Sequence, residues 1–277
     1  MIGRYVARGT GYFIGAFMAV LALFPFVWMI VSSFKDRREI WRIPFQFFPE
    51  SWDLENYRAV FENPQFPMAN AMVVTFIVAC TAVVLSLLLN TMASYSFARI
   101  DFPFKKVFWV ICISTMFIPG LAILITSFLV VHALGMLNTI WVLILPGLIS
   151  GWNIFFFRQF FLNFPRSLEE AAMIDGCSRF RIYRQIFLPM SVPPLVVLGA
   201  GIFLGYWNSF IWPSLTVPGN PRLMQIMQVL RSYSSFYGNN YGQILAGACL
   251  VAIPPIIMFF IFQRWIIQGV VLSGLKE

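Results

Sequence analysis

The stretch from Ala69 to Ala93 reads ANAMVVTFIVACTAVVLSLLLNTMA and contains no charged residue. An α-helix needs about 20 apolar residues to cross the hydrocarbon core of a bilayer, so this run is long enough to do so. Of the 277 residues in the chain, 60% are hydrophobic and 11% are charged, and the mean hydropathy is +0.79. A chain with 31 Phe and 9 Trp cannot cover itself with polar surface in water. The sequence therefore predicts an integral membrane protein.

Five more apolar runs of similar length occur along the chain. Together the six runs span approximately residues 11–34, 69–93, 107–131, 138–161, 193–213 and 244–266. None contains an acidic residue, and Arg158 and Arg264 lie near run ends, where a long side chain reaches the interface. The first run is too long and too bulky for a cleaved signal peptide, so we expect a retained helix. The prediction is an all-α integral membrane protein with about six transmembrane helices in one domain, residues 1–277.

Basic residues indicate which side of the membrane each loop faces, because loops rich in Lys and Arg stay in the cytoplasm. The N-terminus, the second and fourth loops and the tail contain Arg4, Arg8, Arg99, Lys105, Lys106, Arg158, Arg166, Arg179, Arg181, Arg184, Arg264 and Lys276. The opposite side has fewer basic residues, and acidic residues nearly balance them. We therefore expect a multi-pass protein with both termini in the cytoplasm. The formal net charge of +8 reflects this topology, and we expect no nucleic-acid partner.

The first outward loop, about Lys35 to Met68, is long and rich in prolines and aromatic residues. Such a loop fits two roles equally well. It either lies on the membrane surface or receives a partner from outside the cell.

A charged segment, residues 165–190, separates the fourth and fifth apolar runs. Pro165 and Ser167 followed by Glu170 predict a helix start, with Ser167 as the N-cap and Glu170 completing a capping box. Gly176 is suited to the left-handed conformation that ends a helix. A second helix is expected from about Ser178 to Phe187.

The first of these two helices has an unusual face. Leu168, Ala171 and Ala172 would lie together on it, and the small alanines permit close approach of another surface. One interpretation is a protrusion that fits a socket in another protein. The alternative is an amphipathic connector that lies on the cytoplasmic leaflet.

The charged segment resembles the signature loop of permease subunits of bacterial ATP-binding-cassette (ABC) importers. That signature is Glu-Ala-Ala, three residues, Gly, nine residues, Ile, one residue and Leu-Pro. Every position is matched, by Glu170, Ala171, Ala172, Gly176, Ile186, Leu188 and Pro189. The resemblance implies that these residues couple the permease to a cytoplasmic ATPase, as a helix docked in a groove of that subunit. Cys177 departs from the alanine that is common in the family, and the near-isosteric change should leave docking intact.

The resemblance extends over nearly the whole chain and favours the carbohydrate-uptake branch, similar to the second permease of maltose-type importers. That branch carries W-N-x-F-x-x-P in the fifth span, and the chain matches it from Trp207 to Pro213. Residues 241–248, 253–255 and 263–264 also resemble this branch. So does the tail, residues 269–277, which in relatives reaches into the ATPase dimer interface.

This resemblance implies a set of partners in a bacterial cell (inner) membrane: a second homologous permease that completes a heterodimer, two cytoplasmic ATPase subunits, an extracytoplasmic solute-binding protein and membrane lipid. The chain has no G-x-x-x-x-G-K phosphate loop, so ATP and Mg are expected on the partner ATPase. We expect a non-catalytic transport subunit with no cofactor of its own. The four cysteines form no CxxC pair, and no metal site is expected.

Sugars are held by aromatic rings stacked on their C–H faces and by amides bonded to their hydroxyls. Five residues of these types at span depth form a candidate substrate path: Trp152, Asn153, Trp207, Asn208 and Trp212. Their types also have structural explanations, because Trp gathers at membrane interfaces and Asn bridges helices. An alternative is that the partner permease provides most of the residues that contact the sugar.

Other functions are also consistent with a polytopic protein. Importers of a glycerol phosphodiester, an amino acid or a peptide share the signature loop, but the Trp-Asn-rich fifth span favours a sugar or oligosaccharide. A secondary transporter normally has an ionisable relay in the membrane, and no predicted span contains an acidic residue. A membrane-embedded enzyme is disfavoured because the chain has one histidine and no H-E-x-x-H motif.

Overall fold

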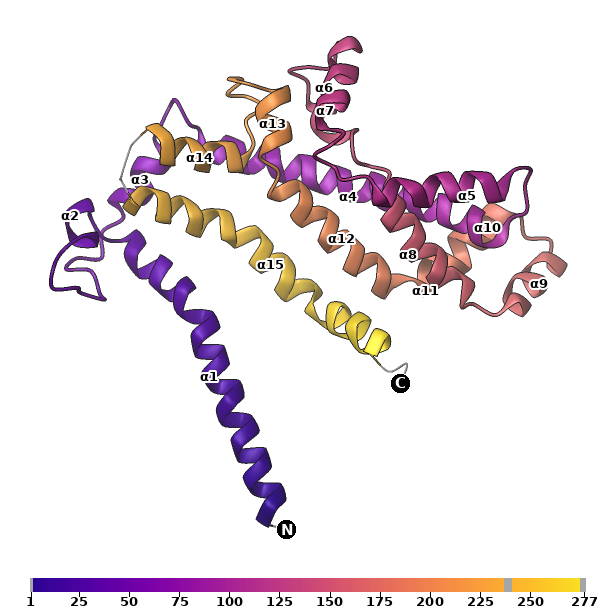
Figure 1. The fold of residues 1–277 in the computed structure, drawn as a ribbon, viewed down its shortest axis with the longest axis horizontal. Coiled ribbons are helices and arrows are strands. Elements are labelled where there is room, and N and C mark those ends of the chain that lie inside the picture. The colour runs from indigo at the N-terminus through magenta and orange to yellow at the C-terminus, as the bar shows by residue number, and fades with distance from the viewer. Residues whose placement is uncertain (1, 237–240, 275–277) are drawn as a thin grey trace. The chain divides into compact units, whose positions relative to one another are not determined.

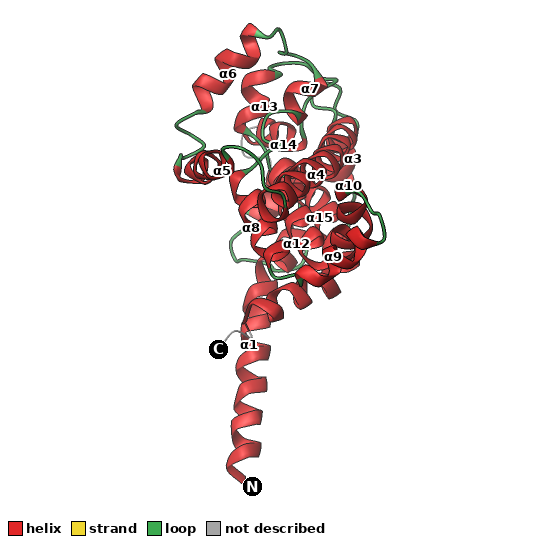
Figure 2. Cartoon of the chain, turned by 90° about the vertical axis from the view of Figure 1, so that its right-hand side faces the viewer, coloured by secondary structure: helices red, strands yellow, loops and turns green. Residues whose placement is uncertain are grey.

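The computed structural model describes residues 2–236 and 241–274, and within these ranges every regular element is helical (Figure 2). The all-α prediction is confirmed. In chain order (Figure 1) the helices are α1 (Ile2–Ser33), α2 (Arg37–Ile40), α3 (Glu55–Phe61), α4 (Met68–Arg99), α5 (Lys105–Ser114), η1 (Thr115–Phe117), α6 (Leu124–Ala133), α7 (Ile140–Ile144), α8 (Gly151–Leu162), α9 (Arg166–Ile174), α10 (Arg179–Ile182), η2 (Tyr183–Phe187), α11 (Leu188–Met190), α12 (Val192–Trp207), α13 (Ile211–Thr216), α14 (Ile226–Phe236) and α15 (Tyr241–Gly274).

The helices fall into two compact units, residues 1–69 with 228–253 and residues 70–227 with 254–277. Three described helices are long and apolar enough to cross a membrane, at Thr10–Ser33, Met68–Arg99 and Tyr241–Ile266. They coincide with the first, second and sixth predicted spans. A fourth candidate joins residues 179–190 to α12 through a bend of 81°.

The third and fourth predicted spans are each divided into separate helices, a feature that the apolar runs did not indicate. Between α5 and α6 the chain leaves the helix around Pro119 and Gly120. Between α7 and α8 it does so around Pro146 and Gly147, whose φ of +96° is incompatible with a right-handed helix. Composition did not reveal these breaks because transmembrane helices tolerate Pro and Gly when neighbouring groups bond the freed backbone.

Buried polar side chains of α4 bond the backbone between α7 and α8. Ser86 Oγ and Asn90 Nδ2 each donate to the Leu148 carbonyl at 2.7 Å, and Asn90 Oδ1 accepts from the Ser150 N–H at 2.9 Å. Both side chains are almost completely buried. An unpaired backbone group in hydrocarbon costs several kcal/mol, so these contacts allow non-helical backbone inside an apolar bundle.

The second unit contains two apolar clusters that α4 shares. One cluster joins α4 to α6 and α7, and its buried members are Val78, Ala82, Val131, Val142, Leu143, Ile144, Leu148 and Val217. The other joins α4 and α8 to the charged segment, through Tyr95, Phe157, Phe161, Ala172, Ile182, Tyr183 and Phe187. This second cluster, the loop cluster, attaches the charged segment to the membrane helices.

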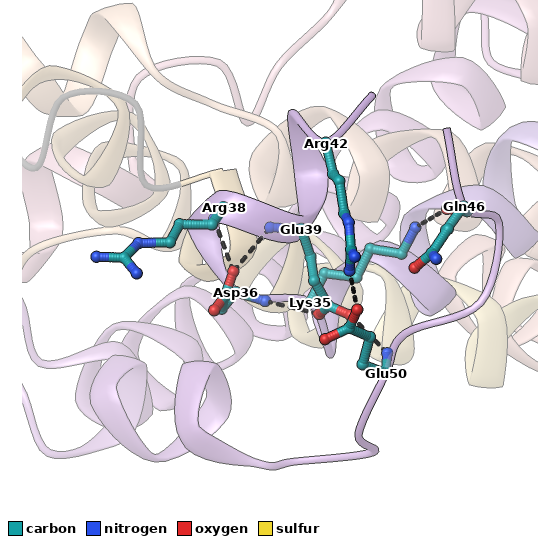
Figure 3. A network of polar contacts seen from close by, with 7 residues as sticks. All are labelled: Lys35, Asp36, Arg38, Glu39, Arg42, Gln46 and Glu50. Carbon is teal, nitrogen blue, oxygen red and sulfur yellow. Dashed lines mark hydrogen bonds and ion pairs between the residues drawn. The ribbon is translucent and has the colours of Figure 1, made fainter. Parts of the chain in front are cut away.

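A polar network orders the loop after α1 in the first unit (Figure 3). Asp36 is the N-cap of α2 and accepts from the Glu39 N–H at 2.8 Å, while the Glu39 side chain accepts from the Asp36 N–H at 3.3 Å. Glu39 also accepts from the Glu50 N–H at 2.5 Å, and Arg42 pairs with the Glu50 carboxylate. The loop after α1, predicted as long and rich in prolines and aromatic residues, is held by hydrogen bonds and an ion pair.

Lys35 is the buried member of this network. Its side chain is 1% exposed, donates to the Gln46 carbonyl, and lies 5.0 Å from the Trp28 ring centroid. Burial lowers the pKa of Lys35, and the nearby Glu39 carboxylate opposes that shift. The lysine therefore crosslinks the loop to the end of α1.

Candidate functional site

The charged segment forms α9, α10, the π-helical turn η2 and the short helix α11. α9 begins directly after Pro165, whose φ of −59° presets helix entry, and no side chain caps it. The predicted capping box of Ser167 and Glu170 is wrong, because Ser167 lies inside the first turn. The second helix begins as predicted, since the Ser178 hydroxyl accepts from the Arg181 N–H at 3.3 Å.

α9 ends in a Schellman motif, as Gly176 predicted. Gly176 has φ +76°, its N–H donates to the Met173 carbonyl at 3.0 Å, and the Cys177 N–H donates to the Ala172 carbonyl at 2.9 Å. A Cβ at Gly176 would meet no atom within 4 Å. The site therefore requires glycine for its backbone conformation and not for lack of space.

The seven signature residues divide into an exposed set and a packed set. The exposed members are Glu170, Ala171, Gly176 and Pro189. The packed members lie in or against the loop cluster and are Ala172, Ile186 and Leu188. The exposed face of α9 also includes Ile174, whose side chain is 86% exposed. A partner would therefore meet Glu170, Ala171 and Ile174, while the packed residues hold the segment in shape.

Sequence reasoning missed Glu169, which is the buried acid of α9 at 5% exposure. Its carboxylate accepts from the Tyr95 hydroxyl at 3.1 Å and lies 3.5 Å from both Arg99 Nη1 and Arg179 Nη1. Two of these partners lie on α4, more than 60 residues away in the chain. No local pattern in the sequence indicates such a pairing.

Two arginines tie the C-terminal ends of α4 and α8 to each other. Arg99 Nη2 donates to the Phe161 and Phe164 carbonyls, both at 2.5 Å. Arg158 Nε, from α8, donates to the Phe97 carbonyl of α4 at 3.2 Å. Each arginine thus bonds carbonyls near the negative end of the other helix, where positive charge is favourable.

A separate feature of the second unit is a cavity of about 490 Å³. Three of the five predicted substrate residues line it: Trp152 and Asn153 from α8 and Trp212 from α13. Trp212 Nε1 donates to the Val142 carbonyl at 2.8 Å, which fixes its ring against α7. The break between α7 and α8 therefore forms one wall, and the turn between α12 and α13 forms another.

The other two predicted substrate residues lie elsewhere. Trp207 is 1% exposed and stacks on Phe203, with ring centroids 5.6 Å apart. Asn208 is exposed at the end of α12 and does not line the cavity. Tyr206, which sequence reasoning did not select, lines the cavity and donates to the Ile144 carbonyl at 3.0 Å.

The lining combines aliphatic and aromatic side chains with a smaller number of polar groups. Hydroxyl and amide groups come from Ser150, Asn153, Tyr206, Ser209 and Gln225. Among the described residues that line this cavity, none carries a charge. Such a wall offers hydrogen bonds and aromatic faces to a solute without electrostatic attraction for an ion.

These features define a membrane transport permease: an all-helical membrane fold, a loop with the full signature spacing, and a cavity lined by apolar, aromatic and uncharged polar side chains. Residues 90–271 match the family described as binding-protein-dependent transport system inner membrane component. The chain belongs to this family, and it is therefore a non-catalytic permease subunit of an ABC importer.

Individual relatives cover almost the whole chain. The arabinooligosaccharides transport system permease protein AraQ of Halalkalibacterium halodurans is 32% identical over 266 residues, which is 94% of each chain. The sn-glycerol-3-phosphate transport system permease protein UgpE of Brucella melitensis is 29% identical over 275 residues, 97% of each chain.

A solved structure shows the same fold. It is the crystal structure of a bacterial ABC transporter involved in the import of the acidic polysaccharide alginate. One of its chains matches with a TM-score of 0.79 at 22% identity, covering 95% of this chain and 97% of that one. The permease fold of the chain is thereby confirmed.

Proposed function

We propose that this chain forms half of the path through which a neutral sugar or oligosaccharide is imported, driven by an ATPase that docks on α9. The observation that carries the proposal is the position of α9. It presents Glu170, Ala171 and Ile174 to solvent, while the loop cluster anchors its other face to α4 and α8. α9 is exposed, ends in a hydrogen-bonded Schellman motif and has the large apolar side chain of Ile174 as its last residue. Such a helix suits a groove in a partner protein.

The substrate class is inferred from the cavity. Trp152, Asn153 and Trp212 provide the indole and amide groups that bind sugars, and the lining carries no charge. UgpE and the alginate transporter are named for anionic solutes, and a site for such a solute would be favoured by a basic group in the wall. The uncharged lining therefore favours a neutral saccharide, of the kind for which AraQ is named.

The remaining partners complete the proposal. A second permease is supported by the apolar surface of α1, where only 6% of an 18-residue apolar window is buried within the chain. The ordered outward loop exposes Trp41 and Trp52 at 64% and 60%, a surface for a solute-binding protein outside the cell. The excess of basic residues at the termini and in the charged segment supports a cytoplasmic location for both termini and α9 in the bacterial cell, and ATP and Mg would then be bound by the ATPase.

Affinity purification of the tagged chain from its native membrane in mild detergent tests the docking proposal. We expect a second permease and a pair of ATPase chains to co-purify, as identified by mass spectrometry. A Glu170→Arg variant, which reverses an exposed charge on α9, should retain the second permease and lose the ATPase. A chain that purifies alone or as a homo-oligomer would contradict the importer assembly.

A matched pair of asparagine variants tests the substrate path. Asn153→Ala removes an amide from the cavity wall, whereas Asn208→Ala removes one that lies outside it. We expect uptake of a radiolabelled neutral oligosaccharide to fall only for Asn153→Ala, with equal ATPase co-purification in both variants. Equal uptake in the two variants would show that this cavity is not the path.

A further inference from the structure

The inner face of α9 carries a buried ionic contact that the signature motif does not include. Glu169 is 5% exposed, and its carboxylate meets the Tyr95 hydroxyl at 3.1 Å and Arg99 and Arg179 at 3.5 Å. The Arg99 side chain is also buried, at 5% exposure, whereas that of Arg179 is 48% exposed. The contact is therefore an interior one on the α4 side and reaches the surface only at Arg179.

This carboxylate connects four helices. Glu169 belongs to α9, Tyr95 and Arg99 to the C-terminal end of α4, and Arg179 to the first turn of α10 (Figure 1). Arg99 continues the connection to α8, because the same guanidinium donates to the Phe161 and Phe164 carbonyls. Glu169 is thus joined to the C-terminal end of α4, whose side chains bond the break beside the cavity, and through Arg99 to the C-terminal end of α8, which begins at that break.

The neighbouring acid has the opposite placement. Successive residues of an α-helix point about 100° apart, so Glu170 faces solvent while Glu169 faces the protein. An apolar contact such as that of Ala172 leaves a helix free to slide or rotate slightly. A carboxylate with one hydrogen bond and two ion pairs restricts both the rotation and the position of α9, because displacement would separate it from the buried Arg99.

We propose that Glu169 is a positioning residue for energy coupling: it locks α9 onto α4 and α8, so that movement of a docked ATPase is transmitted to the cavity walls. This inference rests on the proposed docking of α9. Without the carboxylate, α9 would remain exposed and able to dock. Movement of the docked ATPase would then only rotate α9 and would no longer displace α4 and α8.

The test is Glu169→Gln in the complete importer, purified with its partner permease and ATPase and reconstituted in liposomes with the binding protein. Glutamine keeps the size and a hydrogen-bond acceptor but removes the charge. We expect an unchanged ATPase-to-permease ratio and ongoing ATP hydrolysis, with sugar transported per ATP reduced at least about fivefold, the lower range of a coupling effect. Asp101→Asn is the matched control, because it makes the same change in an exposed ion pair with Lys105 close to the same end of α4.

A second variant separates positioning from simple stability. Glu169→Gln leaves Arg99 buried without its counter-ion, which could lower the amount of folded protein. Glu169→Gln with Arg99→Gln removes both charges. If this double variant reaches wild-type amounts and still transports little per ATP, the positioning role stands.

Three other results would overturn it. Full transport per ATP in Glu169→Gln, or in the double variant at wild-type amounts, would reduce the contact to ordinary packing. Loss of ATPase from the Glu169→Gln complex would make Glu169 part of the docking surface. Absence of any ATPase from the wild-type complex would refute the docking of α9 itself, and the inference would fall with it.

Discussion

Gly176 offers the sharpest test of how α9 works. Its φ of +76° lies in the left-handed region, and a Cβ there would contact no atom within 4 Å. Substitution therefore carries a conformational cost without a steric clash. That cost is about 1–2 kcal/mol for a residue with a Cβ, smaller for asparagine and larger for a β-branched residue.

A cost of this size acts on the two hydrogen bonds of the Schellman motif at the end of α9. A change of 1–2 kcal/mol corresponds to roughly a 5–30-fold change in an equilibrium ratio. The formed end of α9 should become less populated in the order Gly176→Asn, Gly176→Ala, Gly176→Val. Because Gly176 is exposed and outside the apolar clusters, insertion and folding of the membrane helices should be unaffected.

The assay is uptake of labelled oligosaccharide in cells, normalised to the amount of chain in the membrane and to co-purified ATPase. Gly135→Val is the control, because Gly135 has φ +67° and equally open surroundings in the turn after α6. We expect uptake to decline along the Gly176 series and to remain near wild type for Gly135→Val. A Gly176→Val chain that inserts normally and transports at full rate would refute the role of the left-handed cap in coupling. An equal loss in Gly135→Val would show that the effect is general strain.

Three further variants test the packing around the cavity. Gly151→Ala places a Cβ 2.6 Å from the Cys112 carbonyl oxygen. We therefore expect the free energy of unfolding to fall by about 1–3 kcal/mol and the Tm in detergent to decrease. Gly15→Ala is the control: its Cβ meets no atom within 4 Å, so the Tm should remain unchanged. Asn90→Leu leaves the Leu148 carbonyl bonded to Ser86 but removes the acceptor of the Ser150 N–H, so the free energy of unfolding, measured by denaturation, should fall by about 1–3 kcal/mol; wild-type stability would mean that other groups bond this N–H. Trp212→Phe keeps an aromatic ring but loses the hydrogen bond to the Val142 carbonyl. The free energy of unfolding should therefore fall by only about 0.5–1.5 kcal/mol in the same measurement. A larger loss would show that the indole supports the cavity wall by packing.

The class of the protein could be predicted from the sequence because it depends on sums over many residues. Apolar runs free of acidic residues leave few alternatives to membrane helices, and the fixed spacing of the charged segment indicated the kind of transporter. The left-handed conformation of Gly176 at the end of α9 could also be predicted, because glycine at such a helix end is a local sequence signal.

The breaks in the third and fourth spans could not be predicted from composition. Pro146 and Gly147 are compatible with a kinked continuous helix as well as with a break. What decides between them is the pairing of the freed backbone by Ser86 and Asn90, roughly 60 residues earlier in the chain. Such pairings depend on tertiary structure and leave no periodic trace in the sequence.

The substrate residues show the same limit at shorter range. Trp207 and Trp212 belong to one motif. Trp207 is the last residue of α12 and is buried, whereas Trp212 lies on α13 and lines the cavity. The helix α12 ends at Trp207, and the break before α13 changes the direction in which the side chains of α13 point. Residue type alone selected all the candidates, and only the helix boundary separates them.

The division of the signature loop changes what a match to it signifies. Ala172, Ile186 and Leu188 pack in or against the loop cluster, so these positions shape the segment from within. Among the signature positions, only the exposed residues Glu170, Ala171, Gly176 and Pro189 are available to a partner. A substitution at a packed position would therefore disturb ATPase docking indirectly, by deforming the segment, and would imitate loss of a contact. Docking and positioning are best separated at the adjacent pair Glu169 and Glu170, because successive residues of a helix point about 100° apart, so that Glu169 is buried in the protein and Glu170 faces solvent.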